Sequence, residues 1–219
     1  MKQSLLNFKA FTHLTTCKIC NMAYNCLEKN DISEHRKFHD QFVGKTFKIT
    51  MKSSYHIVKR FLDGSKILKI ENSWNEKNLI SRVDEIMSLE LGSSNFPNQS
   101  IYYIHAMPEN DEFSGCIVTE TLNRNSDRNF FLYNSENERT PLEKKAVFKN
   151  TEIIIGILRI FVINKFRKRK IASKIIETVR CDLICNQELS KENIAFCEPT
   201  SAGYAFAKSY IGNSSVLAY

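Results

Sequence analysis

The pattern of apolar and polar positions predicts a series of strands and helices along the chain after residue 50. Residues 57–62 and 66–70 are rich in apolar and β-branched side chains, and they flank Asp63 and Gly64, a pair typical of hairpin turns. Residues 79–91 repeat apolar side chains at helical spacing, and Asn78 just before them is the expected N-cap. The pattern therefore predicts a β-hairpin followed by an amphipathic helix.

The rest of the chain continues this alternation. Polar, aperiodic residues 123–149 predict a long excursion, which in a compact domain is usually functional or mobile. The other predicted elements are strands at 101–107, 115–120, 152–163, 193–197 and 216–219, and helices at 170–185 and 202–210. Strands that alternate with helices in the last third predict a mixed α/β sheet.

A small metal-binding unit is predicted before this domain. Cys17-x2-Cys20 is followed by His35-x3-His39, the spacing of a tetrahedral zinc site in a ββα finger. Tyr24 and Ile32 stand where such a finger needs its two core side chains. Cys26 lies between the ligand pairs but off the pattern, and we expect it to be a spectator.

The start of the finger helix is predicted from a capping-box-like pair. Asp31 and Glu34 stand three residues apart, and a helix that starts there places His35 and His39 one turn apart on one face. A lone finger makes too few phosphate contacts for useful DNA affinity at cellular salt, because DNA-reading fingers usually occur in tandem. We therefore expect a structural zinc and no direct DNA binding.

Composition limits the class of protein. Of 219 residues, 42% are hydrophobic, which excludes wholesale disorder, and 31 Lys and Arg against 24 Asp and Glu give a formal charge of +7. The longest apolar stretch, residues 153–158, is far too short for a membrane span, and the first residues have no apolar signal core. The odd number of seven cysteines fits a reducing compartment better than a disulfide scaffold. We expect a soluble intracellular protein.

Much of the surplus positive charge lies in one loop. Five of the first six residues of the segment 165–173 are basic, and the segment joins a predicted buried strand to an amphipathic helix. A helix N-terminus offers unpaired N–H groups and the positive end of the helix dipole, which suit a phosphate or pyrophosphate. The alternatives are a solvated charge run or a nuclear-import patch.

This loop resembles a known motif. Arg167-x-x-Lys170-Ile171-Ala172 is similar to the acetyl-CoA loop (R/Q-x-x-G-x-G/A) of the GNAT acetyltransferases, with Lys170 in place of the first Gly. Together with the finger, the wider sequence resembles the cohesin (sister-chromatid cohesion) acetyltransferases from about Cys17 to Tyr219. The segments that carry the resemblance are Arg159-Ile160-Phe161-Val162, Leu189-Ser190-Lys191-Glu192, Pro199-Thr200 and Gly203-x-x-Phe206-Ala207-x-x-Tyr210.

The resemblance implies a fold and an activity. It implies a tail at 1–14, a C2H2 zinc finger at 15–43 and a GNAT domain at 50–219. The implied reaction transfers acetyl from acetyl-CoA to lysines on the ATPase head of a cohesin core subunit in the nucleus. The residues implied to contact the cofactor are Ile160, Phe161, Val162, Lys168, Arg169, Lys170, Ile171, Ala172, Ser173, Thr200, Ser201 and Ala202.

Two carboxylates are the candidate catalytic groups. A free lysine amine has a pKa of about 10.4, so a carboxylate that accepts its proton is expected. Glu198 follows a predicted strand directly and aligns with the acidic residue of the family's Ser-Asp-Pro-Thr motif. Glu177 matches a second family acid and is expected to tune or relay, or to be a solvated helix residue. Leu158 stands where family members have Ser.

Three alternatives stay open. Cys197, where the family has Ser, allows an acetyl-enzyme mechanism, which we rank below direct transfer. Leu158 and Lys170 allow a zinc-finger and GNAT binding module with weakened catalysis. Gln3 and Leu6, followed by Phe8 and Phe11, resemble in part a sliding-clamp-binding peptide, with the aromatic pair at a different spacing.

Overall fold

The computed structural model describes residues 13–18, 20, 22–52, 55–71, 76–149, 152–184, 187–212 and 215–219. The chain divides into two compact units, Met1–Lys45 and Thr46–Tyr219. The partial resemblance to a clamp-binding peptide falls on residues 3–11, which lie outside the described residues. No helix in the described ranges has the length and apolar character that a membrane span requires.

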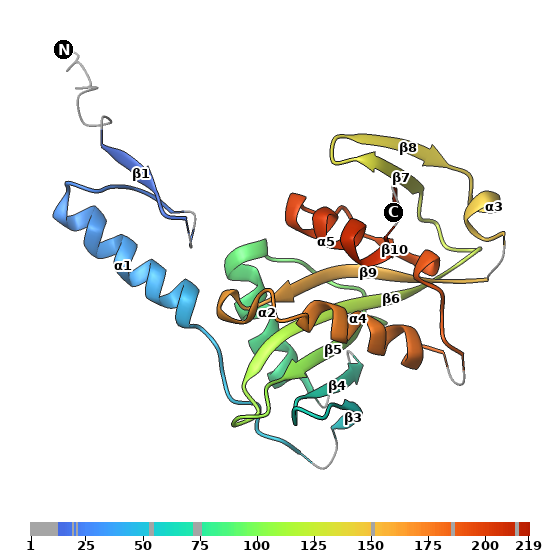
Figure 1. The fold of residues 1–219 in the computed structure, drawn as a ribbon, viewed down its shortest axis with the longest axis horizontal. Helices are drawn as coiled ribbons and strands as arrows, with labels where there is room; N and C mark the ends of the chain where they lie inside the picture. Colours follow the sequence, from blue (N-terminus) through green and yellow to red (C-terminus); the bar gives the residue numbers. More distant parts are fainter. Residues whose placement is uncertain are drawn as a thin grey trace. The chain divides into compact units, whose positions relative to one another are not determined.

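The first unit contains a two-stranded sheet and one helix (Figure 1). β1 (Leu14–Thr16) pairs antiparallel with β2 (Ala23–Asn25), and α1 (Lys29–Gly44) follows. The capping-box prediction is wrong, because α1 begins at Lys29 with Glu28 as N-cap. Asp31 instead accepts a hydrogen bond of 3.0 Å from the Asn25 N–H, so its carboxylate joins β2 to the first turn of α1.

The second unit is built on a sheet with the strand order β3-β4-β5-β6-β9-β10-β11-β7-β8. Its strands β9, β10 and β11 run parallel to one another and are connected by α4 (Ile171–Asp182) and α5 (Ser201–Ile211), and the other pairs are antiparallel. The mixed α/β architecture is thereby confirmed. The strands are β3 His56–Arg60, β4 Lys66–Glu71, β5 Ile101–Ala106, β6 Phe113–Asn123, β7 Phe130–Ser135, β8 Glu138–Leu142, β9 Ile153–Val162, β10 Ile194–Phe196 and β11 Val216–Ala218.

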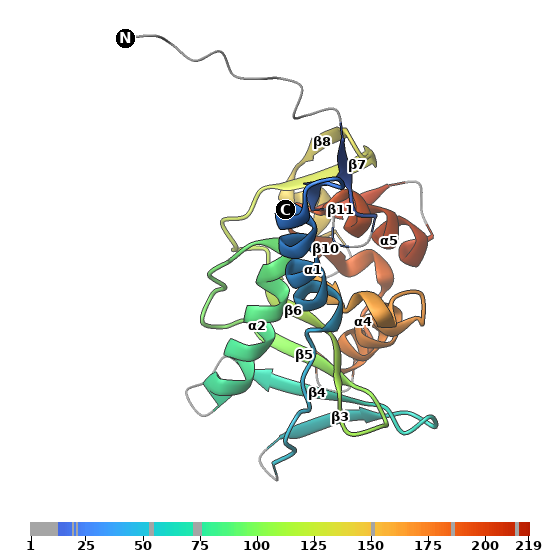
Figure 2. The same cartoon turned by 90° about the vertical axis from the view of Figure 1, so that its left-hand side faces the viewer.

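Helices cover both faces of the sheet. Neighbouring residues on a strand point to opposite faces, and the Tyr102 hydroxyl on β5 reaches Asp84 of α2 (Lys77–Leu91), whereas the Tyr103 hydroxyl reaches Asp182 of α4. α2 and α4 therefore lie on opposite faces, as Figure 2 shows. The buried faces of both helices pack on apolar sheet residues, and most of these side chains form one core cluster.

The prediction that residues 123–149 form a long excursion between regular elements is wrong. This segment forms the hairpin β7–β8 and the short helix α3 (Lys144–Val147), and β7 extends the sheet by pairing antiparallel with β11. Much of this hairpin is exposed, so its strands lack the apolar alternation of a half-buried strand. Polar strands of this kind give little signal in sequence.

Two predicted helix boundaries also differ. α2 begins at Lys77 with Glu76 as N-cap, so Asn78 lies inside the first turn. α4 ends at Asp182, and Cys185 lies outside the described residues.

Candidate functional site

β9 and β10 separate at one end, and this separation is the centre of the candidate site. The two strands pair in parallel as far as Phe196 opposite Ile157. The Cys197 N–H still donates to the Ile157 carbonyl at 2.8 Å. Within the described residues the ladder ends there, so the β10-facing backbone edge of the next β9 residues has no strand partner and can bind a ligand. On this edge the Val162 carbonyl accepts from Arg167 Nε at 2.9 Å.

β9 carries a bulge at the same point. Arg159 lies opposite Val118 and Ile157 opposite Thr119, so Leu158 is the extra residue between two ladder pairs. A bulge bends its strand and redirects its side chains, and bulges are frequent beside active sites. The position where the family has Ser is therefore the bulge itself.

The basic loop forms the N-terminal side of α4. A short 3₁₀ turn, Asn164–Phe166, leads into it, and α4 begins at Ile171 with Lys170 as N-cap. Lys168 and Lys170 both have left-handed backbone, with φ of 62° and 59°. Glycine adopts this conformation without strain, which explains why the family motif has Gly where Lys170 stands.

Charges within the loop are divided into paired and unpaired groups. Lys165 forms an ion pair with Glu112, and Arg167 forms one with Glu90. Lys168, Arg169 and Lys170 have no acidic partner in the described part of the chain, although the Arg169 guanidinium lies 5.5 Å from the centre of the Phe166 ring. Three cations thus remain beside the N–H groups of the first turn of α4, where anions bind well.

A cavity of about 430 Å³, here called the loop cavity, lies between this loop, β9 and α5. Nearly all residues expected to contact the cofactor line it, with the exceptions of Arg169 and Ser201. Its lining residues are Glu90, Leu91, Ile160, Phe161, Val162, Phe166, Arg167, Lys168, Lys170, Ile171, Ala172, Ser173, Thr200, Ala202, Gly203 and Phe206.

A second cavity of about 260 Å³, here called the Glu198 cavity, adjoins the first. It is lined by Leu91, Ser94, Ile157, Leu158, Arg159, Ile160, Phe196, Cys197, Glu198, Pro199, Thr200 and Gly203. Four residues line both cavities: Leu91, Ile160, Thr200 and Gly203. The two cavities therefore meet at these four residues, and one end of a ligand in the loop cavity can lie beside the Glu198 cavity.

Glu198 is held by a strained backbone. It has a φ of 37°, a conformation that L side chains rarely adopt. Such strain costs of the order of 1–3 kcal/mol and clusters at functional sites. Glu198 lies in the short connection between β10 and α5. Two residues later, Thr200 caps α5 by accepting from the Gly203 N–H at 3.2 Å.

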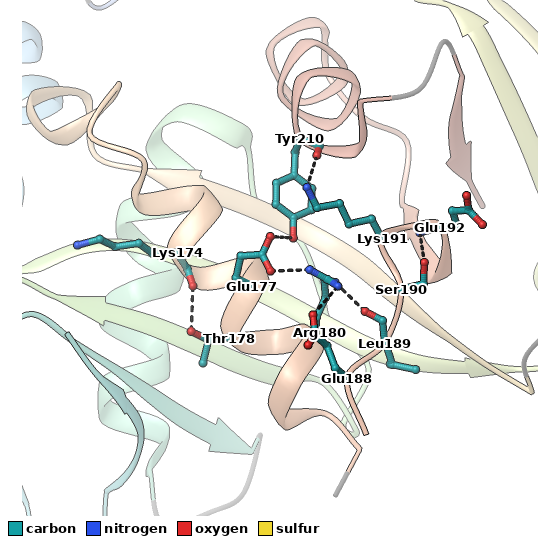
Figure 3. A network of polar contacts seen from close by, with 10 residues as sticks. All are labelled: Lys174, Glu177, Thr178, Arg180, Glu188, Leu189, Ser190, Lys191, Glu192 and Tyr210. Carbon is teal, nitrogen blue, oxygen red and sulfur yellow. Dashed lines mark hydrogen bonds and ion pairs between the residues drawn. The ribbon is translucent and has the colours of Figure 1, made fainter. Parts of the chain in front are cut away.

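The structure places Glu177 in a different environment from Glu198. Its carboxylate accepts a hydrogen bond from Tyr210 at 2.7 Å and pairs with Arg180, in the network drawn in Figure 3. Arg180 is itself buried and donates to the Leu189 carbonyl at 2.7 Å. Glu177 lines a separate groove of about 480 Å³ between α4 and β3, not the Glu198 cavity.

Cys197 lines the Glu198 cavity, but its environment does not favour a thiolate. Burial raises the pKa of the Cys197 thiol, and the neighbouring Glu198 carboxylate raises it further. Nucleophilic cysteines usually have a lowered pKa, so this environment does not support Cys197 as the nucleophile of an acetyl-enzyme.

Sequence reasoning did not find one wall of this site. Leu91 is the last residue of α2, and Ser94 comes soon after it. Both line the Glu198 cavity because α2 packs on the face of the sheet from which the Arg159 side chain projects. The only sequence signal was the Gly92 that ends the helix.

The four predicted zinc ligands come together in the first unit. One ligand atom from each of Cys17, Cys20, His35 and His39 lies within 4.8 Å of the others, and Cys17 Sγ is 3.4 Å from His39 Nδ1. A zinc tetrahedron with bonds of about 2.0–2.3 Å places its ligand atoms roughly 3.3–3.8 Å apart. His35 Nε2 is buried and has no hydrogen-bond partner among the described residues, as expected of a metal ligand.

The finger's predicted core residues support this ligand set. The Tyr24 ring stacks on His35 with centroids 4.0 Å apart, and Ile32 is half-buried. Cys26 is exposed, lies outside the ligand set and contacts the His13 carbonyl.

Two family models match the chain. Residues 3–41 match the zinc-finger of acetyl-transferase ESCO, and residues 151–219 match the ESCO1/2 acetyl-transferase. N-acetyltransferase ESCO1 of Mus musculus is 30% identical over 93% of this chain. These two segments carry the acetyl-transferase and zinc-finger domains of the ESCO/ECO1 family.

The relatives differ in how much of their own length is covered by this chain. N-acetyltransferase ECO1 of Kluyveromyces lactis is 25% identical, with 95% of this chain and 89% of the relative covered. The chain spans only about a quarter of the mouse and human ESCO1 proteins.

A solved structure supports the fold. The xEco2 acetyltransferase domain bound to a K105-CoA conjugate matches with a TM-score of 0.62 and 25% identity, over 76% of this chain and 98% of that one. The second unit therefore has the acetyltransferase fold of this family.

Proposed function

We propose that this chain is an acetyl-CoA-dependent protein-lysine N-acetyltransferase with a structural zinc finger. The observation that carries the proposal is the contact between the two cavities at the separation of β9 from β10. One cavity is lined by the cationic loop and the other by a carboxylate, and Thr200 and Gly203 line both. The homologues are named N-acetyltransferases, and the xEco2 domain was solved with a CoA conjugate.

Each cavity has a separate role in this proposal. Acetyl-CoA supplies the thioester when it is bound. Lys168 and Lys170, with the N–H groups of the first turn of α4, bind its phosphates in the loop cavity. The backbone of Ile160 and the Val162 N–H, on the β10-facing edge of β9, bind the arm that leads to the acetyl group; the Val162 carbonyl already accepts from Arg167 Nε at 2.9 Å.

Glu198 is the proposed general base. A lysine amine attacks the thioester only when the amine is neutral, and a carboxylate next to the amine accepts its proton. Glu198 lines the cavity next to the shared wall, on strained backbone that fixes its place. Glu177 is proposed to act on α4 and α5 through Tyr210 and Arg180, in a tuning role.

The finer proposal concerns substrate and location. We propose that the acceptor lysines lie on the ATPase head of a cohesin core subunit and that the protein acts in the nucleus. Support comes from the family whose models match the chain and from the presence of both the finger and the acetyltransferase domain.

A second candidate is a zinc-finger and GNAT module with weakened catalysis. The observation that favours it is Leu158 at the bulge, because an apolar side chain lines the Glu198 cavity where the family has a hydroxyl. Lys170 no longer favours it, since the loop keeps the left-handed backbone that the usual Gly supplies.

Calorimetry with acetyl-CoA tests the proposal. We expect the Lys168→Ala/Lys170→Ala variant to bind at least tenfold more weakly, because two cations are lost from the loop cavity. The matched control is Lys145→Ala/Lys149→Ala, which removes two exposed cations near α3. Absence of binding by the wild type, or equal affinity of both double variants, would contradict the enzyme.

Acetylation of a purified cohesin ATPase head tests the substrate. Mass spectrometry should find acetyl-lysine on the head with wild-type protein and much less with Glu198→Gln. Binding of acetyl-CoA without any transfer would favour the weakened module, and Leu158→Ser should then restore transfer.

A further inference from the structure

Arg159 holds the end of α2 and the segment after it. Its Nη1 donates to the Gly92 carbonyl at 2.8 Å, and its Nη2 donates to the Leu91 carbonyl at 3.4 Å and to Ser94 Oγ. The last carbonyls of a helix lack partners within the helix, and a cation there also complements the helix dipole. One side chain thus caps α2 and fixes the chain that follows.

An aromatic contact holds the same segment from its other end. The Arg159 guanidinium lies 5.3 Å from the centre of the Phe96 ring, and that ring packs edge-on against Tyr102, with centroids 6.0 Å apart. The segment from Gly92 to Phe96 is therefore attached to Arg159 at two places.

The charge of Arg159 has a nearby counterpart. Burial lowers the pKa of Arg159, and the Asp84 carboxylate offsets part of that lowering. Asp84 is itself held by the Tyr102 hydroxyl at 3.2 Å. The guanidinium remains charged, as Arg does in proteins, and its planar fork can bond several acceptors at once, which Lys cannot reproduce.

These contacts form one wall of the Glu198 cavity. Ser94 and Arg159 line that cavity and do not line the loop cavity. Arg159 comes directly after the bulge residue Leu158 and lies on the α2 face of the sheet, because it is paired with Val118 and Val118 with Tyr102. What it fixes is therefore the acceptor side of the site.

We propose that Arg159 is a positioning residue for the acceptor: it holds the segment from Gly92 to Phe96 as a wall against which the incoming lysine side chain binds. The inference rests on the proposed acetyltransferase function. It adds Arg159 to the residues of that function and assigns the two affinities to different groups. The basic loop determines the affinity for acetyl-CoA, and the Arg159 contacts determine the affinity for the acceptor.

Steady-state kinetics with acetyl-CoA and a lysine-containing cohesin head fragment test this inference. We expect Arg159→Met to raise the KM for the acceptor about tenfold or more, with the Kd for acetyl-CoA changed less than twofold. Arg159→Lys should rescue only part of the effect, because it restores the charge but not the fork. The control is Arg139→Met, which removes an arginine of β8 that lies over the Phe131 ring of β7 and leaves both cavities intact.

A second readout does not depend on turnover. Hydrogen exchange of the amides in residues 92–96 should be at least tenfold faster in Arg159→Met than in wild type, with α4 and α5 unchanged. Equal exchange, or an unchanged acceptor KM in an active variant, would overturn the role of Arg159. A wild type that binds no acetyl-CoA and transfers nothing would overturn the proposed function instead, even with the exchange difference present.

Discussion

The Tyr210 hydroxyl donates a hydrogen bond of 2.7 Å to the Glu177 carboxylate and so joins α5 to α4. Burial raises the pKa of Tyr210, and the bond to Glu177 raises it further, so the phenol is a neutral donor at any ordinary pH. These two helices carry the two sides of the loop cavity. The contact therefore holds α4 and α5 in the relative position that forms that cavity.

We expect Tyr210→Phe to lower the free energy of unfolding by about 1 kcal/mol, the usual net value of one hydrogen bond. Chemical denaturation of the purified protein measures this change. Tyr204→Phe is the matched control on the same helix, because the buried Tyr204 hydroxyl has no partner in the described residues and its loss should cost nothing. Equal destabilisation by both changes would contradict the prediction.

We expect Glu198→Gln to lower turnover by about 100-fold or more and to leave acetyl-CoA affinity within twofold, since the amide keeps the shape but accepts no proton. Glu177→Gln should lower turnover less, because Glu177 lies outside the Glu198 cavity. Single-turnover kinetics measure both, with Glu192→Gln, an exposed acid after Ser190, as control. Undiminished turnover in Glu198→Gln would exclude it as the base.

Zinc content should be about one ion per chain, because four ligands close one tetrahedral site. The Cys17→Ser/His39→Ala variant should lose the ion and the circular-dichroism signal of α1, while the affinity of residues 46–219 for acetyl-CoA is retained. Cys26→Ser is the control, since Cys26 lies outside the ligand set. Full zinc content in the double variant would refute this site.

Sequence predicted the elements whose apolar pattern is set by burial. β9 and α4 are buried on one or both sides, so their spacing was readable, and the loop between them was recognisable by its charge. The β7–β8 hairpin was missed because much of it is exposed. The local sequence signals at helix starts were weaker still. The N-caps are Glu76 and Glu28, which lie two and three residues before the predicted Asn78 and Asp31.

The candidate site was predicted only in part for the same physical reason. Loop residues that bind a ligand through one motif lie close in sequence, so ten of the expected cofactor contacts share one cavity. The acceptor wall depends on Arg159 bonding to Leu91 and Gly92 across the sheet. Such a contact arises from tertiary packing, and no motif carries it.

We expect Lys170→Gly to raise the free energy of unfolding by roughly 0.5–1 kcal/mol. A left-handed L residue costs roughly 1–2 kcal/mol, and the greater freedom of glycine in the unfolded chain offsets part of the gain. Acetyl-CoA should bind several-fold more weakly, because a loop cation is lost. Lys170→Ala is the control: it should lose the same affinity with no gain in stability, as measured by thermal unfolding and calorimetry.

The protein should lose stability as pH falls from about 6.5 toward 4, because of His105. This side chain is 1% exposed, and its Nδ1 lies 2.7 Å from Ser114 Oγ. Burial, and to a lesser extent the Lys174 charge, lower its pKa to about 4, although Asp63 raises the pKa in part. In the unfolded chain, histidine titrates near 6.5.

The sign follows from proton uptake. Between these two values the unfolded chain binds a proton that the folded chain does not, so stability is fully present above about 6.5 and falls by roughly 3 kcal/mol by pH 4. His105→Asn keeps an amide near the Ser114 hydroxyl but has no titrating group, so it should show a flatter pH dependence. Denaturation curves at pH 7, 5.5 and 4.5 measure the difference. His56→Asn, an exposed histidine on β3, should keep the wild-type slope, and an equal slope in all three proteins would show that His105 is not the cause.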